Sequence, residues 1–470
     1  MPTTRRQFSS GLAGAALQTR SPRPPNIVLI LSDDHTVPHL GCYGDPVIQT
    51  PHLDRFAAQG IRFDRAFTAA PQCVPSRTGF LTGRSPVAAR MGRFSSPLPP
   101  DIATLPELLR AKEYFTGICR RWYHLDGPAR PGPVTGPLFE KHAMRTFAKR
   151  VDFLDGGSPR AKTAERVNAF FDKRPSGKPY FLWVNFNDPH HAWDRDNPFD
   201  RYDRARIPVP AYLPDLPGLR DDLARYYGEI SRMDDEFRTV LDIVDRRGGG
   251  DTIVVFAGDN GYAFPHGKGS LYDPGLNVPF LLRWPGVVKP GAVTRELVSG
   301  EDLTPTLLEA AGVAPAKGMT GRSFLPLLRV GAAYQPREHI FAARLAHGNS
   351  PVTEDTKANT FDLSRCVRSK THKLIYNCTP QYEYWPVDSG RDAGWQEMAA
   401  ARAGKLAPKH DRAYFGKRPV LELYDLEKDP AELDNVAGQA PYAAIQRELM
   451  VALQEKMIVD YDFLPLPLAE

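Results

Sequence analysis

The chain has 470 residues, of which 42% are hydrophobic and 24% are charged. This length and composition exclude a disordered or fibrous protein and suit one large α/β domain with a smaller second domain. The 60 basic residues exceed the 55 acidic ones by too little to indicate a nucleic-acid-binding protein, although a polyanionic substrate would not be repelled. Five cysteines in so long a chain exclude a disulfide scaffold, and their odd number leaves at least one thiol for another role.

The N-terminus has the pattern of a weak twin-arginine export signal. Arg5 and Arg6 precede a short apolar stretch over residues 11–17. Export would place the protein in the periplasm or outside the cell. The alternative is a disordered basic tail over residues 1–24 on a cytoplasmic protein. Because no apolar run reaches about 18 residues, we expect no membrane-spanning helix.

Three apolar runs end in polar side chains, which is typical of strands buried on both faces of a parallel sheet. They are NIVLILSDD at 26–34, PYFLWVNFNDPHH at 179–191 and DTIVVFAGDNG at 251–261. In open α/β sheets, functional groups gather at the carboxyl ends of the strands. We therefore expect these three strand ends to converge on one crevice.

Helical patterns separate the predicted strands, and the order of elements predicts two domains. Amphipathic patterns occupy residues 50–60, 103–114 and 219–247. The passage from 312 to 336 is rich in Gly, Pro and Ala, which indicates a linker. The sequence thus predicts an α/β fold: a large, mostly parallel mixed sheet flanked by helices over residues 25–335, and a smaller α+β domain over residues 336–470.

The C-terminal domain contains two further patterns. Residues 365–378 predict two short strands around a turn centred on His372, which could bring Cys366 and Cys378 opposite each other. Of the two outcomes, a disulfide or two reduced core thiols, we expect the reduced thiols. Residues 418–437 predict a strand, a turn and the start of a C-terminal helix.

Two pairs of hard oxygen donors follow predicted strands. Asp33 and Asp34 end the first strand, and Asp259 and Asn260 end the third. Oxygen ligands without a nearby thiol and imidazole cluster favour Ca²⁺ or Mg²⁺ over zinc. The alternative for each pair is a capping or turn-forming role, since Asp and Asn are common in turns.

The segment PQCVPSRTGFLTGR at 71–84 contains an isolated cysteine, Cys73. Pro75 suits the first position of a helix, and residues 76–78 would then form its first turn. A helix N-terminus with Arg77 in its first turn favours binding of an anion, with Cys73 at its mouth. The alternatives for Cys73 are a small buried hydrophobic residue or a thiolate nucleophile, which would need a histidine base from elsewhere in the chain.

The sequence CVPSR at 73–77, followed by LTGR at 81–84, resembles the signature of the formylglycine-dependent sulfatases of the alkaline phosphatase superfamily. Three other features agree with that family: the two aspartates after the first strand, GDNG at 258–261, and ELYDLEKDPAELDNVA at 422–437. The resemblance extends over about residues 25–460.

The resemblance implies a modified active-site residue. In this family a maturation enzyme oxidises the cysteine, here Cys73, to formylglycine, whose hydrated aldehyde supplies the oxygen that attacks sulfur. Arg77 would stabilise charge on the transferring group. The resemblance further implies one divalent cation, with Ca²⁺ expected and Mg²⁺ as the alternative, bound by Asp33, Asp34, Asp259, Asn260 and the modified Cys73.

The resemblance also implies a Lys-x-His pair after a strand, and here the sequence departs from it. His124 matches the histidine, but Trp122 stands where the lysine is expected. Either Arg120 or Arg121 could take over the role of that lysine, or the anion is held differently.

Two more catalytic candidates come from the resemblance. His190 matches the family's Pro-His motif, with His191 the less favoured neighbour, and Lys268 matches a late basic residue near the sulfate. Lys268 would contact sulfate oxygens, and an imidazole, from His124 or His190, with a pKa near the working pH would protonate the leaving group. Taken singly, each could instead be a surface or satisfied core residue.

We interpret the chain as a sulfatase that hydrolyses a sulfate ester or sulfamate of a sulfated saccharide. The segments YHLDGP, NDPHH and FPHGKGSLYDPG are most similar to heparan N-sulfatases, which favours a terminal glucosamine N-sulfate. The alternatives are a sulfatase acting on O-sulfated carbohydrates and a phosphodiesterase or phosphonate monoester hydrolase of the same superfamily. A carbohydrate-binding relative with an unmodified, inactive cysteine is a further alternative. We expect no nucleic-acid partner, and the oligomeric state stays open.

Overall fold

The computed structural model describes seven stretches of the chain: residues 23–94, 96–127, 132–157, 160–329, 331–347, 361–402 and 404–468. The predicted export signal, with Arg5 and Arg6, lies outside these residues. Within them, no helix is both long enough and apolar enough to cross a membrane.

An eight-stranded sheet forms the centre of the molecule, in the order β5-β4-β6-β1-β7-β8-β2-β9. β1 pairs in parallel with β6 on one side and β7 on the other, whereas β8 runs antiparallel to both of its neighbours. The prediction of a mostly parallel mixed sheet is therefore confirmed. The strands are β1 (Asn26–Ser32), β2 (Ile61–Phe63), β4 (Phe115–Arg120), β5 (Phe153–Asp155), β6 (Tyr180–Asn185), β7 (Thr252–Gly258), β8 (Phe280–Arg283) and β9 (Ala292–Thr294).

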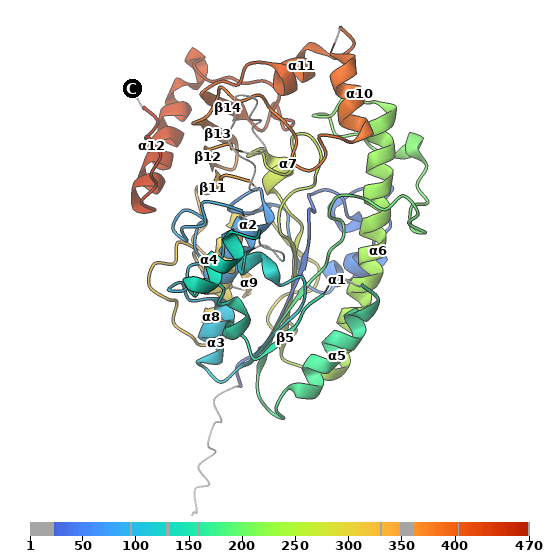
Figure 1. Ribbon diagram of the computed structural model, residues 1–470, viewed down its shortest axis with the longest axis vertical. Coiled ribbons are helices and arrows are strands. Elements are labelled where there is room, and N and C mark those ends of the chain that lie inside the picture. The colour runs from blue at the N-terminus through green and yellow to red at the C-terminus, as the bar shows by residue number, and fades with distance from the viewer. Residues whose placement is uncertain are drawn as a thin grey trace, which may run out of the picture.

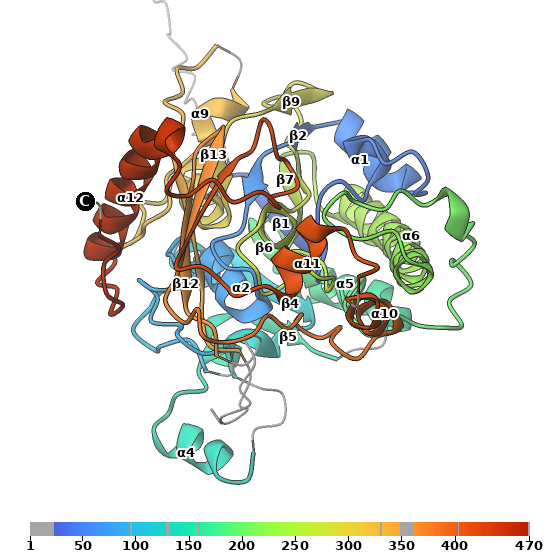
Figure 2. The same ribbon diagram turned by 90° about the horizontal axis from the view of Figure 1, so that it is seen from above.

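Helices cover both faces of this sheet (Figures 1 and 2). Alternate residues of β1 face opposite sides, so that Val28 and Ile30 pack in one apolar cluster while Ile27 and Leu29 pack in the other. Helices of the first cluster are α1 (Pro51–Ala58), α5 (Thr163–Lys173) and α6 (Pro217–Arg247). Helices of the second are α2 (Cys73–Thr82), α3 (Leu105–Arg110) and α8 (Leu303–Ala310). A sheet buried on both faces explains the continuous apolar runs in its central strands.

The C-terminal region forms a second, antiparallel sheet beside the first (Figure 1). Its strands are β11 (Ile340–Arg344), β12 (Ser364–Arg368), β13 (His372–Asn377) and β14 (Leu421–Asp425). The long helix α12 (Ala443–Val459) packs on it through an apolar cluster that includes Leu449, Leu453, Val367 and Leu374. The predicted boundary at 335/336 falls in the irregular segment before β11 and stays a prediction.

The remaining elements are short. They are β3 (Ala66–Phe67), which pairs with β10 (Val298–Ser299), and the helices α4 (Thr135–Lys141), α7 (Asp273–Leu276), α9 (Leu325–Leu328), α10 (Ala393–Ala401) and α11 (Pro408–Phe415).

The structure corrects two details of the C-terminal predictions. Arg368 pairs with Lys373, so the hairpin is not centred on His372, and Cys366 lies opposite Ile375. Cys366 and Cys378 are free thiols, as expected.

The predicted start of a C-terminal helix within residues 418–437 is wrong, because α12 begins at Ala443. Instead, the Asp429 carboxylate accepts hydrogen bonds from the backbone N–H groups of Leu433 and Asp434, both at 2.7 Å. This local side-chain bonding competes with helix formation.

Candidate active site

Two strand ends place acidic groups against each other. Ser32 of β1 is in register with Gly258 of β7, so the residues that follow both strands meet at one edge of the sheet. The Asp34 backbone N–H donates to Asp259 Oδ1 at 3.0 Å, and Asn260 Nδ2 donates to Asp34 Oδ1 at 2.9 Å. All of these side chains are fully buried. The predicted convergence of strand ends is therefore present.

Cys73 lies at the head of α2 and faces the same acidic cluster. Its Sγ is 3.4 Å from Asp33 Oδ1 and 3.9 Å from Asp34 Oδ1. Burial raises the pKa of the Cys73 thiol well above its usual value, which argues against the alternative of a thiolate nucleophile. The helix starts at Cys73 rather than at Pro75, since a proline fits anywhere in the first turn, where the N–H groups have no partner within the helix.

Arg77 links the two acidic pairs. Its Nε donates to Asp259 Oδ2 at 2.9 Å, its Nη2 is 3.1 Å from Asp33 Oδ2, and its Nη1 donates to Asn185 at the end of β6. Burial alone would raise the pKa of Asp33, but the guanidiniums of Arg121 and Arg77 hold it well below its usual value. Arg77 thus joins the carboxylates on the floor of the site to the end of β6.

The structure separates the two arginines that could replace the family lysine. Arg120, at the end of β4, has a φ of 72° and directs its side chain away from the site, where it pairs with Glu236 of α6. Arg121 contacts Asp33 with its Nη1, and 12% of its side chain is exposed. The Trp122 indole lies against Gly156 instead of the acidic cluster. Of these three residues, Arg121 is the cation at the site.

Lys268 and His190 lie beside Asp34. Lys268 Nζ is 2.8 Å from Asp34 Oδ1 and 3.5 Å from His190 Nε2, and that nitrogen is 3.9 Å from Asp34 Oδ2. Burial would lower the pKa of Lys268, but the charges of Asp34 and Asp388 raise it well above its usual value. Lys268 is therefore a charged ammonium at the site.

The two candidate histidines are neutral at pH 7. Burial, reinforced by Lys268, lowers the pKa of His190 to about 3. Burial and the charge of Arg121 lower the pKa of His124 well below its usual value. The expectation of an imidazole with a pKa near the working pH is therefore not met. Either ring can still act as a neutral hydrogen-bond donor.

Three residues at the mouth were missed by the sequence analysis, and all come from the C-terminal region. Asp388 Oδ2 is 2.7 Å from Lys268 Nζ, Asp392 Oδ2 is 2.7 Å from His191 Nε2, and His347 Nδ1 is 2.6 Å from Gln72 Nε2, next to Cys73. They lie in irregular segments without a periodic or motif signal. Nothing in the local sequence distinguishes them from other loop residues.

The oxygen donors of the site fit a hard divalent cation, but the unmodified cluster also contains a thiol and an imidazole, which are donors that zinc prefers. Asp33, Asp34, Cys73 and His190 each offer one ligand atom, and these atoms lie within 4.8 Å of one another. Asn260 Oδ1 is buried and has no hydrogen-bond partner in the described part of the chain. Carboxylate and amide oxygens are the ligands that Ca²⁺ and Mg²⁺ prefer. Burial and the charge of Asp33 raise the pKa of Asp259 to about 7, as expected for a crowded acidic site.

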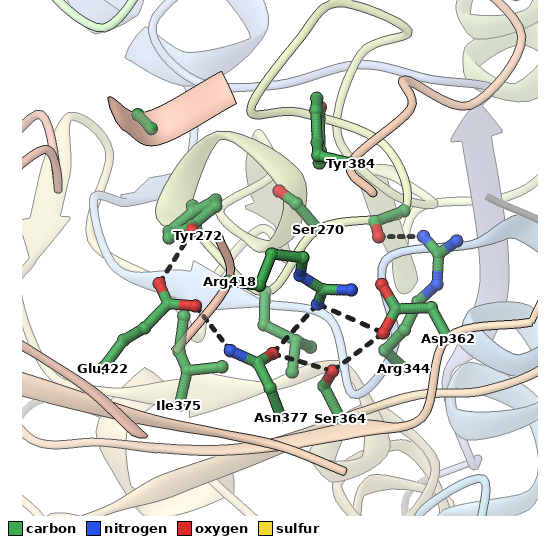
Figure 3. Close-up of a pocket in the computed structure, with 13 residues that line it drawn as sticks. Ser270, Tyr272, Arg344, Asp362, Ser364, Ile375, Asn377, Tyr384, Arg418 and Glu422 are labelled. Atoms are coloured by element: carbon green, nitrogen blue, oxygen red, sulfur yellow. Dashed lines mark hydrogen bonds and ion pairs between the residues drawn. The ribbon is translucent and has the colours of Figure 1, made fainter. Parts of the chain in front are cut away.

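A small cavity of about 40 Å³ lies behind the loop that bears Lys268 (Figure 3). Figure 3 shows polar contacts around it: Tyr272 donates to Glu422 at 2.7 Å, and Arg344 separately donates to the carbonyl of Gly269. Tyr384 accepts a hydrogen bond from the backbone N–H of His266 at 2.9 Å. The C-terminal region thus supports the Lys268 loop from behind.

A large mixed sheet with an acidic cluster and a cysteine-headed helix at its strand ends defines an alkaline phosphatase-like hydrolase. The family model "Sulfatase" matches residues 25–313, and a second model, "N-sulphoglucosamine sulphohydrolase, C-terminal", matches residues 261–393. The chain belongs to the sulfatase family, whose members are sulfate ester hydrolases.

Relatives and solved structures agree with this assignment. The chain is 28% identical to an ulvan-active sulfatase of Formosa agariphila, with 91% of this chain and 78% of the relative covered. It is 27% identical to the human N-sulphoglucosamine sulphohydrolase, with 90% and 88% covered. A structure in complex with its substrate D-glucosamine-2-N,6-O-disulfate superimposes with a TM-score of 0.68 at 19% identity, covering 94% of this chain and 99% of the other. That likeness shows the shared fold.

Proposed function

We propose that this sulfatase releases sulfate from a sulfated saccharide, with a terminal glucosamine N-sulfate as the best candidate, after Cys73 has been converted to formylglycine by a maturation enzyme. The observation that carries the proposal is the placement of Cys73, within the sulfatase signature, against Asp33 and Asp34. The N-sulfate assignment is supported by the C-terminal family model and by the human relative.

The charge of the site suits a singly charged sulfate monoester. Three cations, Arg77, Arg121 and Lys268, face four carboxylates, Asp33, Asp34, Asp259 and Asp388. With all four carboxylates ionised, as a bound cation would keep Asp259, these groups carry one net negative charge, which a divalent ion would turn into one net positive charge. A sulfate ester or sulfamate would neutralise this charge, whereas a doubly charged phosphate monoester would exceed it.

The residues of the site have separable roles in this proposal. Asp33, Asp34, Asp259 and Asn260, with the modified Cys73, would hold the cation, most simply Ca²⁺, which when bound supplies Lewis-acid activation. Arg77 and Arg121 would bind the transferring sulfate from the floor, and Lys268 from the opposite side. Arg121 would thereby take the place of the lysine that the family has at Trp122.

His124 and His190 are placed to serve the leaving group. Cleavage of an S–N bond expels an amine, which needs stabilisation by a hydrogen-bond donor more than an activated phenol does, and the N–H of a neutral imidazole can donate that hydrogen bond. His190 is the nearer candidate, because its Nε2 lies 3.5 Å from Lys268 Nζ and its side chain is 26% exposed toward the mouth. His124, which is buried, would support the anion site from the side of Arg121.

The test is sulfate release by matured, Ca²⁺-supplied enzyme from glucosamine N-sulfate and from glucosamine 6-O-sulfate. Release from the N-sulfate supports the proposal, and Cys73→Ala protein serves as the blank. Release from the 6-O isomer alone would show that the substrate is an O-sulfate instead of an N-sulfate. Release from neither, together with turnover of a phosphodiester, would contradict the proposal.

A further inference from the structure

The Lys268 ammonium contacts two carboxylates, and a bound metal ion would compete with it for one of them. Nζ lies 2.8 Å from Oδ1 and 2.9 Å from Oδ2 of Asp34, and 2.7 Å from Oδ2 of Asp388. Asp34 belongs to the proposed cation site, so a divalent ion would compete with the ammonium for the Asp34 oxygens. Asp388 lies outside that ligand set. It is therefore the partner that Lys268 keeps when the site is loaded.

The location of Asp388 differs from that of the other carboxylates around Lys268. The side chain of Asp388 is 30% exposed, against 0% for Asp34 and 1% for Lys268. Asp388 thus lies on the solvent side of the ammonium, where a substrate enters. Nζ thus lies between a buried carboxylate on the floor of the site and a partly exposed carboxylate at its mouth.

The backbone at Asp388 has a positive φ. Its φ is 69°, in the left-handed region that residues other than Gly, Asn and Asp rarely adopt. The turn is fixed by a hydrogen bond from the Ser389 N–H to the Val387 carbonyl at 2.9 Å, and by the nearby pair of His191 with Asp392.

We propose that Asp388, supplied by the C-terminal region, is a positioning residue for Lys268. It anchors the ammonium at the rim so that its remaining N–H groups face the sulfate of the substrate instead of the Asp34 carboxylate. The inference rests on the proposed function, in which Lys268 binds sulfate.

Two effects of Asp388 on sulfate have opposite signs. As an isolated carboxylate it repels sulfate, so its neutralisation would strengthen sulfate binding. As the anchor of Lys268 it strengthens sulfate binding, so its neutralisation would weaken it. Asp388→Asn removes the charge while keeping a residue that tolerates the left-handed backbone.

The experiment measures binding of inorganic sulfate by calorimetry to matured, Ca²⁺-loaded protein in a double-mutant cycle. The four proteins are the parent, Asp388→Asn, Lys268→Met and the double variant. We expect Asp388→Asn to weaken sulfate binding about tenfold in the parent, the size of one hydrogen bond to a charged group. In the Lys268→Met background the same change should leave sulfate affinity unchanged or strengthen it. The KM of a sulfate ester should rise with the sulfate dissociation constant, while kcat changes less.

A matched control is Asp392→Asn, which neutralises a carboxylate of the same segment that pairs with His191 and not with Lys268. Its sulfate affinity should stay close to that of the parent. Stronger sulfate binding by Asp388→Asn, or equal weakening in both backgrounds, would overturn the positioning role and leave the proposed function intact. A parent protein that binds no sulfate would overturn both.

Discussion

The floor of the active site and its rim differ in burial and in origin. The floor groups follow strands of the large sheet or head α2, and the side chains of Arg77, Asp33 and Asp259 are completely buried. The rim is formed by residues whose side chains are 14% to 30% exposed: His190, His191, Asp388 and Asp392. Two of these come from the C-terminal region. The floor is thus a closed network suited to chemistry common to the family, and the rim is where one substrate can be distinguished from another.

The largest expected effect on the floor of the active site comes from removal of Cys73, the precursor of the nucleophile. We expect Cys73→Ala to lower turnover by at least about 10⁴-fold, because no other group can supply the attacking oxygen. Thermal unfolding should change little, and mass spectrometry of the parent peptide should show formylglycine. Cys366→Ala, a buried cysteine of the C-terminal sheet, is the control and should keep its activity. An intact thiol at Cys73 in fully active enzyme would contradict this role.

Asp259→Asn should impair the floor of the active site by weakening cation binding. We expect Ca²⁺ affinity to fall at least about 100-fold and turnover to fall with it, because a ligand is lost and Arg77 loses one of its carboxylate partners. Metal content and turnover are measured on the same sample. Asp245→Asn, which neutralises a 48% exposed carboxylate paired with Arg283, should change neither. Full activity after exhaustive chelation would count against the cation site.

Substitutions of the adjacent residues Arg120 and Arg121 should affect different properties, the unfolding free energy for Arg120 and catalysis for Arg121. Arg121→Gln should lower kcat/KM about 10²-fold, since its charge serves the anion, and should cost less stability than Arg120→Gln, because the buried Asp33 keeps Arg77 as a partner. Arg120→Gln should instead cost about 3 to 5 kcal/mol of unfolding free energy, because it leaves Glu236 as a buried, unpaired charge. Steady-state kinetics and urea unfolding of both variants are the measurements. The reverse pattern would show that Arg120 holds the anion.

Substrates with different leaving groups should distinguish the role of His190 from that of Lys268. We expect His190→Ala to reduce turnover of a sulfamate about tenfold more than that of an activated aryl sulfate, whose phenolate departs without help. Lys268→Ala should reduce both alike, because it contacts the sulfate. The ratio of the two kcat/KM values is the readout. Equal losses for His190→Ala on the two substrates would assign it a role other than hydrogen bonding to the leaving group.

The smallest expected effect is on the pH dependence of stability at the rim. Burial would lower the pKa of His191, but its hydrogen bond to Asp392 raises it above the usual value. Stability from the protonated pair is therefore fully present below the unfolded pKa of about 6.5 and is lost as pH rises through the folded pKa. His191→Gln should cost about 1 kcal/mol near pH 5.5 and almost nothing near pH 9. Urea unfolding at both pH values measures this, with the exposed His142→Gln as control, and a cost independent of pH would argue against the ion pair.

Much of the floor follows from local sequence. The three apolar runs with polar ends predict β1, β6 and β7, because a strand buried on both faces needs continuous apolar residues. Their parallel arrangement brings Asp34 and Asp259 to the same edge. The spacing of Cys73 and Arg77 within the sulfatase signature identifies the residues of the α2 head. For these groups, position along a strand or helix was enough to predict position in space.

The rim was decided by the tertiary structure. Asp388 and Asp392 reach the site only because the C-terminal region packs beside the loop of Lys268. Their contacts with Lys268 and His191 join residues 120 and 201 positions apart, which no local pattern encodes. The choice between Arg120 and Arg121 depends on one left-handed backbone angle at Arg120 and on the presence of Glu236 as its partner. Sequence therefore determined which strand ends bear the chemistry, because local hydrophobic patterns fix the strands. Packing determined which distant charges surround it, because side-chain direction depends on neighbours that only the folded chain supplies.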